Sequence, residues 1–297
     1  MLLTASIFHI SRCSLNDGPG IRTVVYFKGC NLSCRWCHNP EGQTSQPEIL
    51  FAQAKCIGCG SCSDLCPTCH TPTGFDRTLC TVCGKCADQC TAHALEIVGK
   101  PYTPNALFDE IIKDEAYYQN GGGVTISGGE CLLQAGFVAE FLRICKNHDI
   151  HTLIESAFYV PQTSIEQVLP YTDAIYVDCK LFDAEKHRLY TGHCNKRILQ
   201  NIRLFAPKTS MTVRIPMIPN VNDDMENLHQ TVHFAKEAGA KRVELLRFNP
   251  LGASKYETIG KTAEIFGTET QEKSEMLMVT SALNAYIGAE NFVYCNI

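Results

Sequence analysis

The sequence of 297 residues lacks the features that mark nucleic-acid-binding, membrane and exported proteins. It has no basic cluster, and 26 Lys and Arg against 31 Asp and Glu give a net charge of −5, which disfavours a nucleic-acid surface. It has no apolar run near the ~20 residues that a membrane span needs. Its N-terminus lacks the charged start and small-residue cleavage pattern of a secretory signal. We therefore expect a cytoplasmic protein with neither a nucleic-acid nor a membrane partner.

Cysteine, in contrast, is abundant, with 18 residues. Because the chain lacks an export signal, metal binding explains so many thiols better than disulfides do. Hydrophobic residues make up 45% of the sequence, which is typical of a globular protein. The length suits one large α/β barrel or two domains.

Cys30, Cys34 and Cys37 form a compact C-x3-C-x2-C run. No fourth thiol belongs to this run. Three protein ligands would leave one position of a bound metal open, and an open position distinguishes a reactive metal site from a closed structural one. A structural zinc site or a disulfide is the alternative.

Two further runs share the spacing C-x2-C-x2-C-x3-C. In bacterial two-cluster ferredoxins, which have this doubled run, the fourth Cys of each run ligates the other cluster. By that rule one cluster takes a first set, Cys56, Cys59, Cys62 and Cys90, and the other takes a second set, Cys80, Cys83, Cys86 and Cys66. A pair of zinc knuckles is the alternative, but two interleaved groups of four thiols suit iron and sulfide better.

Outside these runs the chain alternates apolar strand patterns with helical patterns. Thr103 and Pro104 have the pattern of an N-cap and first helical residue, and Asn222 to Ala238 has that of a helix ended by Gly239. The expected parallel strands are 21–27, 124–127, 150–154, 174–177, 212–215 and 242–248. We therefore predict an α/β fold: a partial parallel (β/α)6 TIM-like barrel of residues 1–52 and 100–297. We expect residues 53–99 to form a ferredoxin-like insert with two [4Fe-4S] clusters.

Polar residues stand at the ends of several expected strands, where α/β barrels place their chemistry. Gly128 and Gly129 allow a ligand to approach the backbone, and Glu130 offers a carboxylate to an ammonium group, although such triplets are often only turns. Asp178 and Lys180 point to the same side of a strand, as an ion pair or as ligands for a ribose and a carboxylate.

The cysteine run, with Trp36 before its third Cys, resembles that of the radical S-adenosylmethionine (SAM) enzymes. The upstream segment from Asn16 to Arg22, which includes DGPG-IR, resembles the start of the glycyl radical enzyme activating enzymes. The resemblance implies that Cys30, Cys34 and Cys37 form the catalytic cluster site. It also raises Arg214 and Glu155 to ligand candidates, although Arg214 alone suggests a surface or ion-pair residue. The implied cofactor-binding residues are Trp36, Cys37, His38, Gly128, Gly129, Glu130, Asp178, Cys179, Lys180, Arg214 and Asn249.

Asn249 departs from the family pattern, because a His is common at this position. An amide donates and accepts hydrogen bonds but does not titrate near neutrality. The sequence therefore does not support a proton carrier there.

The resemblance also implies the activity, the cofactors and the partners. The expected cofactors are SAM and three [4Fe-4S] clusters, and the expected activity is reductive cleavage of SAM followed by hydrogen abstraction from a backbone glycine of a partner glycyl radical enzyme. The insert would relay electrons from flavodoxin or ferredoxin, or would serve structure or docking. The alternatives are a radical SAM enzyme acting on a small molecule, and a non-enzymatic electron carrier that works through Cys56 to Cys90 alone.

Overall fold

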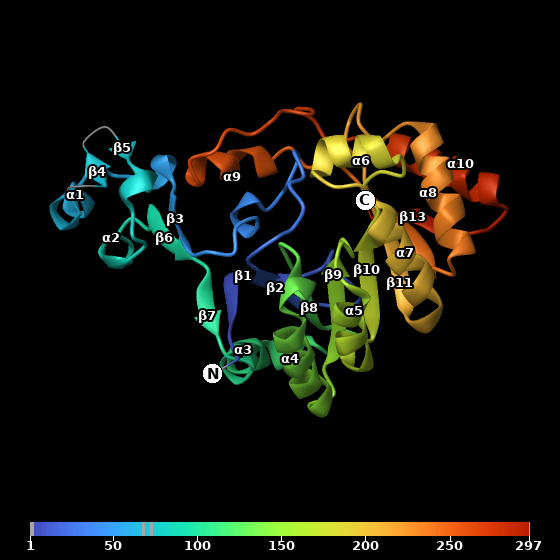
Figure 1. The fold of residues 1–297 in the computed structure, drawn as a ribbon, viewed down its shortest axis with the longest axis horizontal. Helices are drawn as coiled ribbons and strands as arrows, with labels where there is room; N and C mark the ends of the chain where they lie inside the picture. Colours follow the sequence, from blue (N-terminus) through green and yellow to red (C-terminus); the bar gives the residue numbers. More distant parts are fainter. Residues whose placement is uncertain (1–2, 67–68, 72–73, 297) are drawn as a thin grey trace.

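A single large sheet organises the structure, a computed structural model that describes residues 3–66, 69–71 and 74–296. The nine strands lie in the order β13-β12-β11-β10-β9-β8-β2-β1-β7 (Figure 1). The strands from β13 to β2 are parallel, and β1 and β7 add antiparallel pairs at one edge. The bounds are β1 Ala5–Ser14, β2 Arg22–Phe27, β7 Lys100–Tyr102, β8 Gly123–Gly128, β9 His151–Ser156, β10 Ala174–Asp178, β11 Ser210–Pro216, β12 Arg242–Leu246 and β13 Val293–Cys295.

All six predicted parallel strands are present, with ends shifted by a few residues at most. Their apolar runs are buried on both faces, as expected of a parallel sheet that is covered on both sides. The short strand β13 adds a seventh parallel strand that the sequence did not predict.

Helices α3, α4, α5, α7, α8 and α10 contribute residues to the core of the sheet, whereas α6 and α9 lie over its carboxyl edge (Figure 1). Their bounds are α3 Pro104–Ile111, α4 Ala135–Asn147, α5 Gln162–Val168, α6 Ala184–Thr191, α7 Lys196–Phe205, α8 Met225–Glu237, α9 Gly252–Thr258 and α10 Lys273–Ile287. Thr103 caps α3 as predicted, because its hydroxyl accepts a hydrogen bond from the Ala106 N–H at 3.2 Å.

The predicted start of α8 at Asn222 was wrong, since the helix begins at Met225. Asp224 caps it instead, with its carboxylate accepting from the Asn227 N–H at 2.9 Å. Asn222 lies in the preceding loop, fully buried, and its amide donates to the carbonyls of Lys180 and Pro216 at 2.6 Å each.

Between β2 and α3 the chain leaves the sheet to form a separate lobe, residues 48–98, which projects to the left in Figure 1. Its stem is the antiparallel pair β3 (Glu48–Phe51) and β6 (Leu95–Val98). Beyond the stem lie α1 (Ser61–Leu65), α2 (Lys85–Asp88) and the short pair β4 (His70–Thr71) and β5 (Gly74–Phe75).

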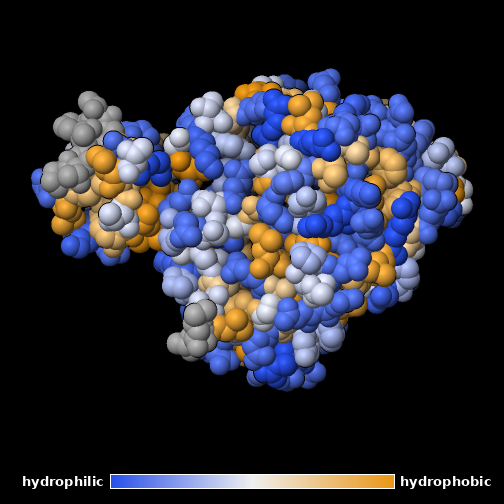
Figure 2. All heavy atoms as spheres, in the orientation of Figure 1, coloured by the Kyte–Doolittle hydropathy of each residue, from blue (hydrophilic) through white to orange (hydrophobic). Residues whose placement is uncertain are grey.

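The lobe has a small apolar core of its own. Ile49, Cys86 and Leu95 form a buried cluster that is distinct from the large core of the sheet and its helices. Apolar residues also reach the surface of the lobe in Figure 2. In the described part of the chain, none of the helices combines the length and the apolar character that crossing a bilayer requires.

Candidate functional site

The three cysteines of the first motif lie in a loop, residues 28–43, that leaves the carboxyl end of β2; we call it the cysteine loop. Two backbone hydrogen bonds close it on itself, from Gly29 N–H to the Gly42 carbonyl at 2.8 Å and from Cys30 N–H to the Gln43 carbonyl at 3.0 Å. Burial raises the pKa of the Cys30 and Cys34 thiols to about 12. Such thiols are poor nucleophiles on their own, which is consistent with a ligand role that requires a metal to favour the thiolate.

The end of α6 supports the middle of the loop. Ser33 N–H donates to the Thr191 carbonyl at 2.9 Å, and Arg35 N–H donates to the Tyr190 carbonyl at 3.0 Å. The loop is therefore fixed from outside as well as by its own hydrogen bonds.

The glycine pair after β8 packs directly beneath the loop. A Cβ on Gly129 would overlap the carbonyl oxygen of Gly29 and lie 2.5 Å from that of Gly42. The next residue, Glu130, donates its backbone N–H to the Gly29 carbonyl at 2.7 Å. Only glycine permits this close approach of two backbones.

The Glu130 carboxylate is fully buried below the loop and is already hydrogen-bonded. It accepts from the Ser156 hydroxyl at 2.8 and 2.9 Å, from the Ala157 N–H at 3.0 Å and from the Leu132 N–H at 3.1 Å. Burial raises its pKa, and these hydrogen bonds oppose that rise. The carboxylate is thus held rigidly near Cys30, and its predicted contact with an ammonium group stays a prediction.

Asp178 and Lys180 form an ion pair of 2.7 Å at the end of β10. Burial lowers the pKa of Lys180. The charge of Asp178, and then the nearby Cys34 thiol, raise this pKa by more than burial lowers it, so the net shift is upward. Lys180 therefore lies between a carboxylate and the cysteine loop. Cys179, between them in sequence, is buried in the core with its thiol bonded to Thr231, so its side chain points away from this site.

Arg214, inside β11, is engaged by two buried carboxylates. Its guanidinium is paired with Glu155 and lies 3.1 Å from Glu244. Burial raises the pKa of Glu155 to about 7, against the opposing charge of Arg214. Sequence analysis missed Glu244, although a charged residue in the middle of the apolar strand β12 is a signal that could have identified it.

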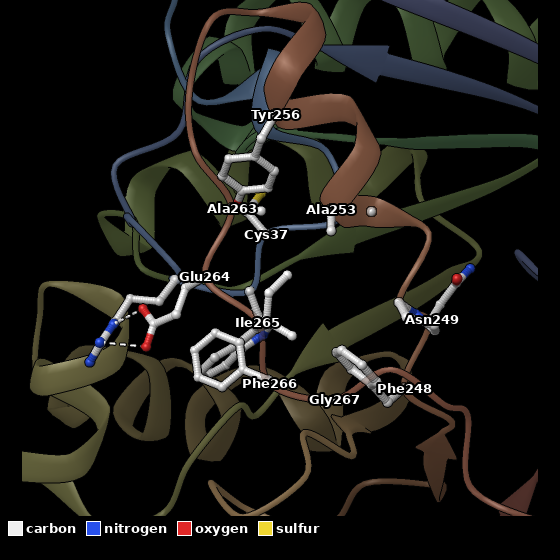
Figure 3. Close-up of a pocket in the computed structure, with 14 residues that line it drawn as sticks. Cys37, Phe248, Asn249, Ala253, Tyr256, Ala263, Glu264, Ile265, Phe266 and Gly267 are labelled. Atoms are coloured by element: carbon white, nitrogen blue, oxygen red, sulfur yellow. Dashed lines mark hydrogen bonds and ion pairs between the residues drawn. The ribbon is translucent and has the colours of Figure 1, made fainter.

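A partly open pocket lies beside Cys37 (Figure 3). Trp36 and Phe266 meet edge to face in its wall, with ring centroids 5.9 Å apart. Asn249 also lines it, but its side-chain oxygen accepts from the Leu251 N–H at 3.0 Å and its amide points away from Cys37 in Figure 3. His38 packs against Gly252, where a Cβ would lie 2.9 Å from the imidazole ring.

A second pocket lies in the lobe. Its lining includes all four thiols of the first set, Cys56, Cys59, Cys62 and Cys90, and also Cys86 of the second set. These are the thiols that the ferredoxin rule assigns to one cluster, and four thiolates suit an iron–sulfur cluster. Among the described residues, no three His, Cys, Asp or Glu side chains are grouped closely enough to hold a single metal ion.

The chain is similar to known proteins over most of its length and of theirs. A model of the family described as a 4Fe-4S single cluster domain matches residues 16–199. The (2S)-3-sulfopropanediol dehydratase activating enzyme of Klebsiella oxytoca is 41% identical over 90% of this chain and 89% of its own. The trans-4-hydroxy-L-proline dehydratase activating enzyme of Clostridioides difficile is 39% identical over 91% of this chain and 92% of its own.

One solved structure has the same fold in its matching part. Streptococcus suis SuiB, bound to its precursor peptide SuiA, superposes with a TM-score of 0.56 at 13% identity, over 95% of this chain and 49% of SuiB. The predicted class, a mixed α/β fold built on a parallel sheet, is therefore confirmed.

Proposed function

The chain belongs to the glycyl radical enzyme activating enzymes, and we propose that it generates a glycyl radical on a partner enzyme at a site built from Cys30, Cys34 and Cys37. The observation that carries this proposal is the cysteine loop, whose three thiols lie at the carboxyl edge of the sheet beside Lys180 and Glu130. The three thiols would hold a [4Fe-4S] cluster, which with SAM would supply the radical chemistry for removing a hydrogen atom from a glycine of the partner.

The residues around the loop are suited to hold the cofactor. Asp178 and Lys180 offer a carboxylate and an ammonium group at one strand end, for a ribose hydroxyl and a carboxylate of SAM. Arg214 lies on the neighbouring strand, and its pairing with two carboxylates fixes its orientation. Gly128 and Glu130 complete this edge beneath the loop.

The cavity beside Cys37 suits the adenine ring. Trp36, Phe248 and Phe266 give it an aromatic wall suited to a planar ring. Its position next to one of the three thiols would keep the rest of SAM near the loop. His38 and Asn249, at the rim, would contribute through their backbone and through packing.

We also propose that the predicted insert, residues 53–99, is ferredoxin-like and carries two further clusters. The cavity shared by Cys56, Cys59, Cys62 and Cys90 supports one of them, and the second set, Cys66, Cys80, Cys83 and Cys86, would hold the other. The total would be three [4Fe-4S] clusters, with residues 1–52 and 100–297 forming the partial barrel. The physiological electron donor would be flavodoxin or ferredoxin.

The partner is a glycyl radical enzyme, and its reaction is a matter for experiment. The relatives named above are activating enzymes of two dehydratases, and a further relative, 36% identical over 96% of this chain, is an indoleacetate decarboxylase activating enzyme of Tractidigestivibacter scatoligenes. A small-molecule substrate is the alternative, but the similarity over nearly the full length to such activating enzymes favours a protein substrate.

The test is an anaerobic reconstitution with iron and sulfide, followed by iron analysis and an assay of 5′-deoxyadenosine formed from SAM and dithionite. We expect about twelve irons per chain, from three four-iron clusters. Cys34→Ala should abolish SAM cleavage and lower the iron content, whereas Cys13→Ala, at an exposed thiol outside the motifs, should leave both unchanged.

The opposite result would favour the electron-carrier alternative. About eight irons without SAM cleavage would mean that the cysteine loop holds no cluster. If the expected result is obtained, candidate partner enzymes can be screened for a glycyl radical by electron paramagnetic resonance (EPR).

A further inference from the structure

Helix α9 contacts both the cysteine loop and the lobe. Towards the loop, the Lys255 ammonium donates to the Asn39 side chain at 2.8 Å and pairs with Glu41 at 3.4 Å. The Tyr256 ring, almost completely buried, lies beside the Cys37 thiol (Figure 3). One face of this short helix is therefore part of the wall around the proposed cluster site.

On the side of the lobe, α9 is approached by strand β3 and by Arg77, whose side chain bonds to the helix end. Its guanidinium donates both to the Thr258 carbonyl at the end of α9 and to the Ile49 carbonyl in β3. It also lies over the Phe75 ring, 5.0 Å from the centroid. A Cβ on Gly260 would lie 2.6 Å from the Arg77 Nε atom, so the helix end is shaped to receive this side chain.

Arg77 begins a short 3-10 turn, Arg77–Leu79, that leads directly into Cys80 of the second set. The Cys80 N–H donates back to the Arg77 carbonyl at 3.2 Å. The connection from Cys37 through Tyr256 and Thr258 to Arg77 and Cys80 therefore consists of packed or bonded neighbours. In Figure 1, α1 lies at the far-left end of the lobe; it contains Cys62 of the first set and is followed directly by Cys66 of the second, so Cys80 is the thiol that α9 approaches through Arg77.

We propose that Arg77 is a positioning residue: it pins the Cys80 end of the lobe on α9 and thereby fixes the second cysteine set, rather than the first, next to the cysteine loop. The inference rests on the proposed function, because its consequence is that the second set delivers the electron to the loop. In that transfer a cluster held by the second set would lose one electron and a cluster held by the cysteine loop would gain it, and no bond would form or break. An external one-electron reductant then restores the second set.

The guanidinium is suited to this role because its planar fork can bond two carbonyls at once, whereas a lysine ammonium is a single point charge. Arg77→Ala should release the lobe from α9 without disturbing the separate cores of the lobe and the sheet. Arg77→Lys, which keeps the charge, should rescue docking only in part.

The first measurement is amide hydrogen exchange on the reconstituted protein. Because a hydrogen bond from a charged donor contributes roughly the free energy that shifts an equilibrium tenfold, Arg77→Ala should speed exchange in residues 252–262 by about tenfold or more. The matched control is Glu96→Ala, which removes the exposed Lys55–Glu96 pair on the lobe. Equal exchange in Arg77→Ala and Glu96→Ala would overturn the proposal.

The second measurement is the rate at which dithionite reduces the cluster of the cysteine loop, followed by freeze-quench EPR. Misplacement of reacting groups by a small distance costs rates heavily, so Arg77→Ala should slow this reduction by about tenfold. The spin coupling between the loop cluster and the second set should weaken in parallel. Unchanged rate and coupling would contradict a positioning role.

The same reduction assay distinguishes the two cysteine sets when one exposed thiol of each set is replaced. Cys83→Ala, in the second set, should reduce the rate to that of the double variant Cys59→Ala/Cys83→Ala, which gives the baseline for direct reduction by dithionite. Cys59→Ala alone, in the first set, should stay clearly above that baseline. The reverse order would assign the proximal position to the first set and overturn the proposal, whereas a wild-type protein that cleaves no SAM would overturn the proposed function instead.

Discussion

At the scale of single residues, the tightest constraint in the site is the contact between Gly129 and the cysteine loop. A methyl group on Gly129 would collide with the carbonyls of Gly29 and Gly42, and neither carbonyl can move without breaking the loop. Gly129→Ala should therefore displace the loop, at a cost of about 1–3 kcal/mol in unfolding free energy.

The displacement has a specific signature in the iron content. We expect Gly129→Ala to retain about eight irons per chain after reconstitution, because the lobe is untouched, and to cleave no SAM. Gly136→Ala is the matched control, since its Cβ would meet only the Gln167 side chain at 3.8 Å. An iron content of about twelve in Gly129→Ala would show that the loop tolerates the methyl group.

Glu155 gives the site a pH dependence of defined sign. Burial raises its pKa from 4.5 to about 7, so the folded chain binds more protons than the unfolded chain between these values. The unfolding free energy should consequently fall as the pH rises through this window, by up to about 1.4 kcal/mol per pH unit. The contribution of Glu155 is fully present below pH 4.5 and is lost above its folded pKa.

Urea unfolding of the wild type and of Glu155→Gln at about pH 5 and about pH 8 tests this, because the glutamine removes only this titration. The stability of the wild type relative to the variant should be lower at the higher pH. A difference that does not change with pH would mean that Glu155 keeps an ordinary pKa.

At the scale of elements, capping decides where α8 starts. Asp224 accepts from the Asn227 N–H at 2.9 Å, and this bond satisfies one of the free donors at the helix N-terminus. Asp224→Ala should cost about 1 kcal/mol, whereas Asp224→Asn, which keeps an acceptor oxygen, should cost much less. Equal losses in the two variants, measured by urea unfolding, would assign the effect to charge rather than to the cap.

The elements with a strong local pattern were predictable from the sequence. The six parallel strands have apolar runs bounded by turn residues, and the Thr103 cap has a local signature. The strand β13 is only three residues long and depends on β12 for its pairing, so it carries no such pattern. Asn222 resembles a helix start, but it serves instead as a buried hydrogen-bond donor to the Lys180 carbonyl, and this role depends on tertiary contacts.

The same holds for the candidate site. The cysteine spacing and the polar strand ends are local signals, and the residues that they single out lie at the carboxyl edge of the sheet. The partners of these residues were not predictable: Glu244 meets Arg214 only through strand pairing, and Arg77 meets the carbonyl of a residue 181 positions away. Long-range contacts of this kind leave no trace in the spacing of one sequence.

At the scale of the whole molecule, the lobe has its own small core, and we expect that it can be removed as a unit. The chain leaves and re-enters the stem at neighbouring positions, where the Ala52 N–H donates to the Ala94 carbonyl at 2.8 Å. Replacing residues 53–93 by a short glycine linker should preserve the β3–β6 hairpin and the main core. We expect a folded protein that binds about four irons and retains SAM affinity, as measured by iron analysis and calorimetry.

The control for this deletion is the full chain carrying Cys59→Ala and Cys83→Ala, which alters both sets but keeps the lobe. Similar SAM affinity in the two proteins would show that the lobe does not contribute to cofactor binding. A deletion variant that does not fold would show that the contacts of α9 with the lobe are essential to the body.

The exposure of the thiols also determines how oxygen would damage this protein. Cys56, Cys59 and Cys83 are exposed on the lobe, whereas Cys30, Cys34 and Cys37 are partly covered by α6 and α9. Oxidants in solution would therefore reach the proposed clusters of the lobe before they reach the proposed cluster of the cysteine loop.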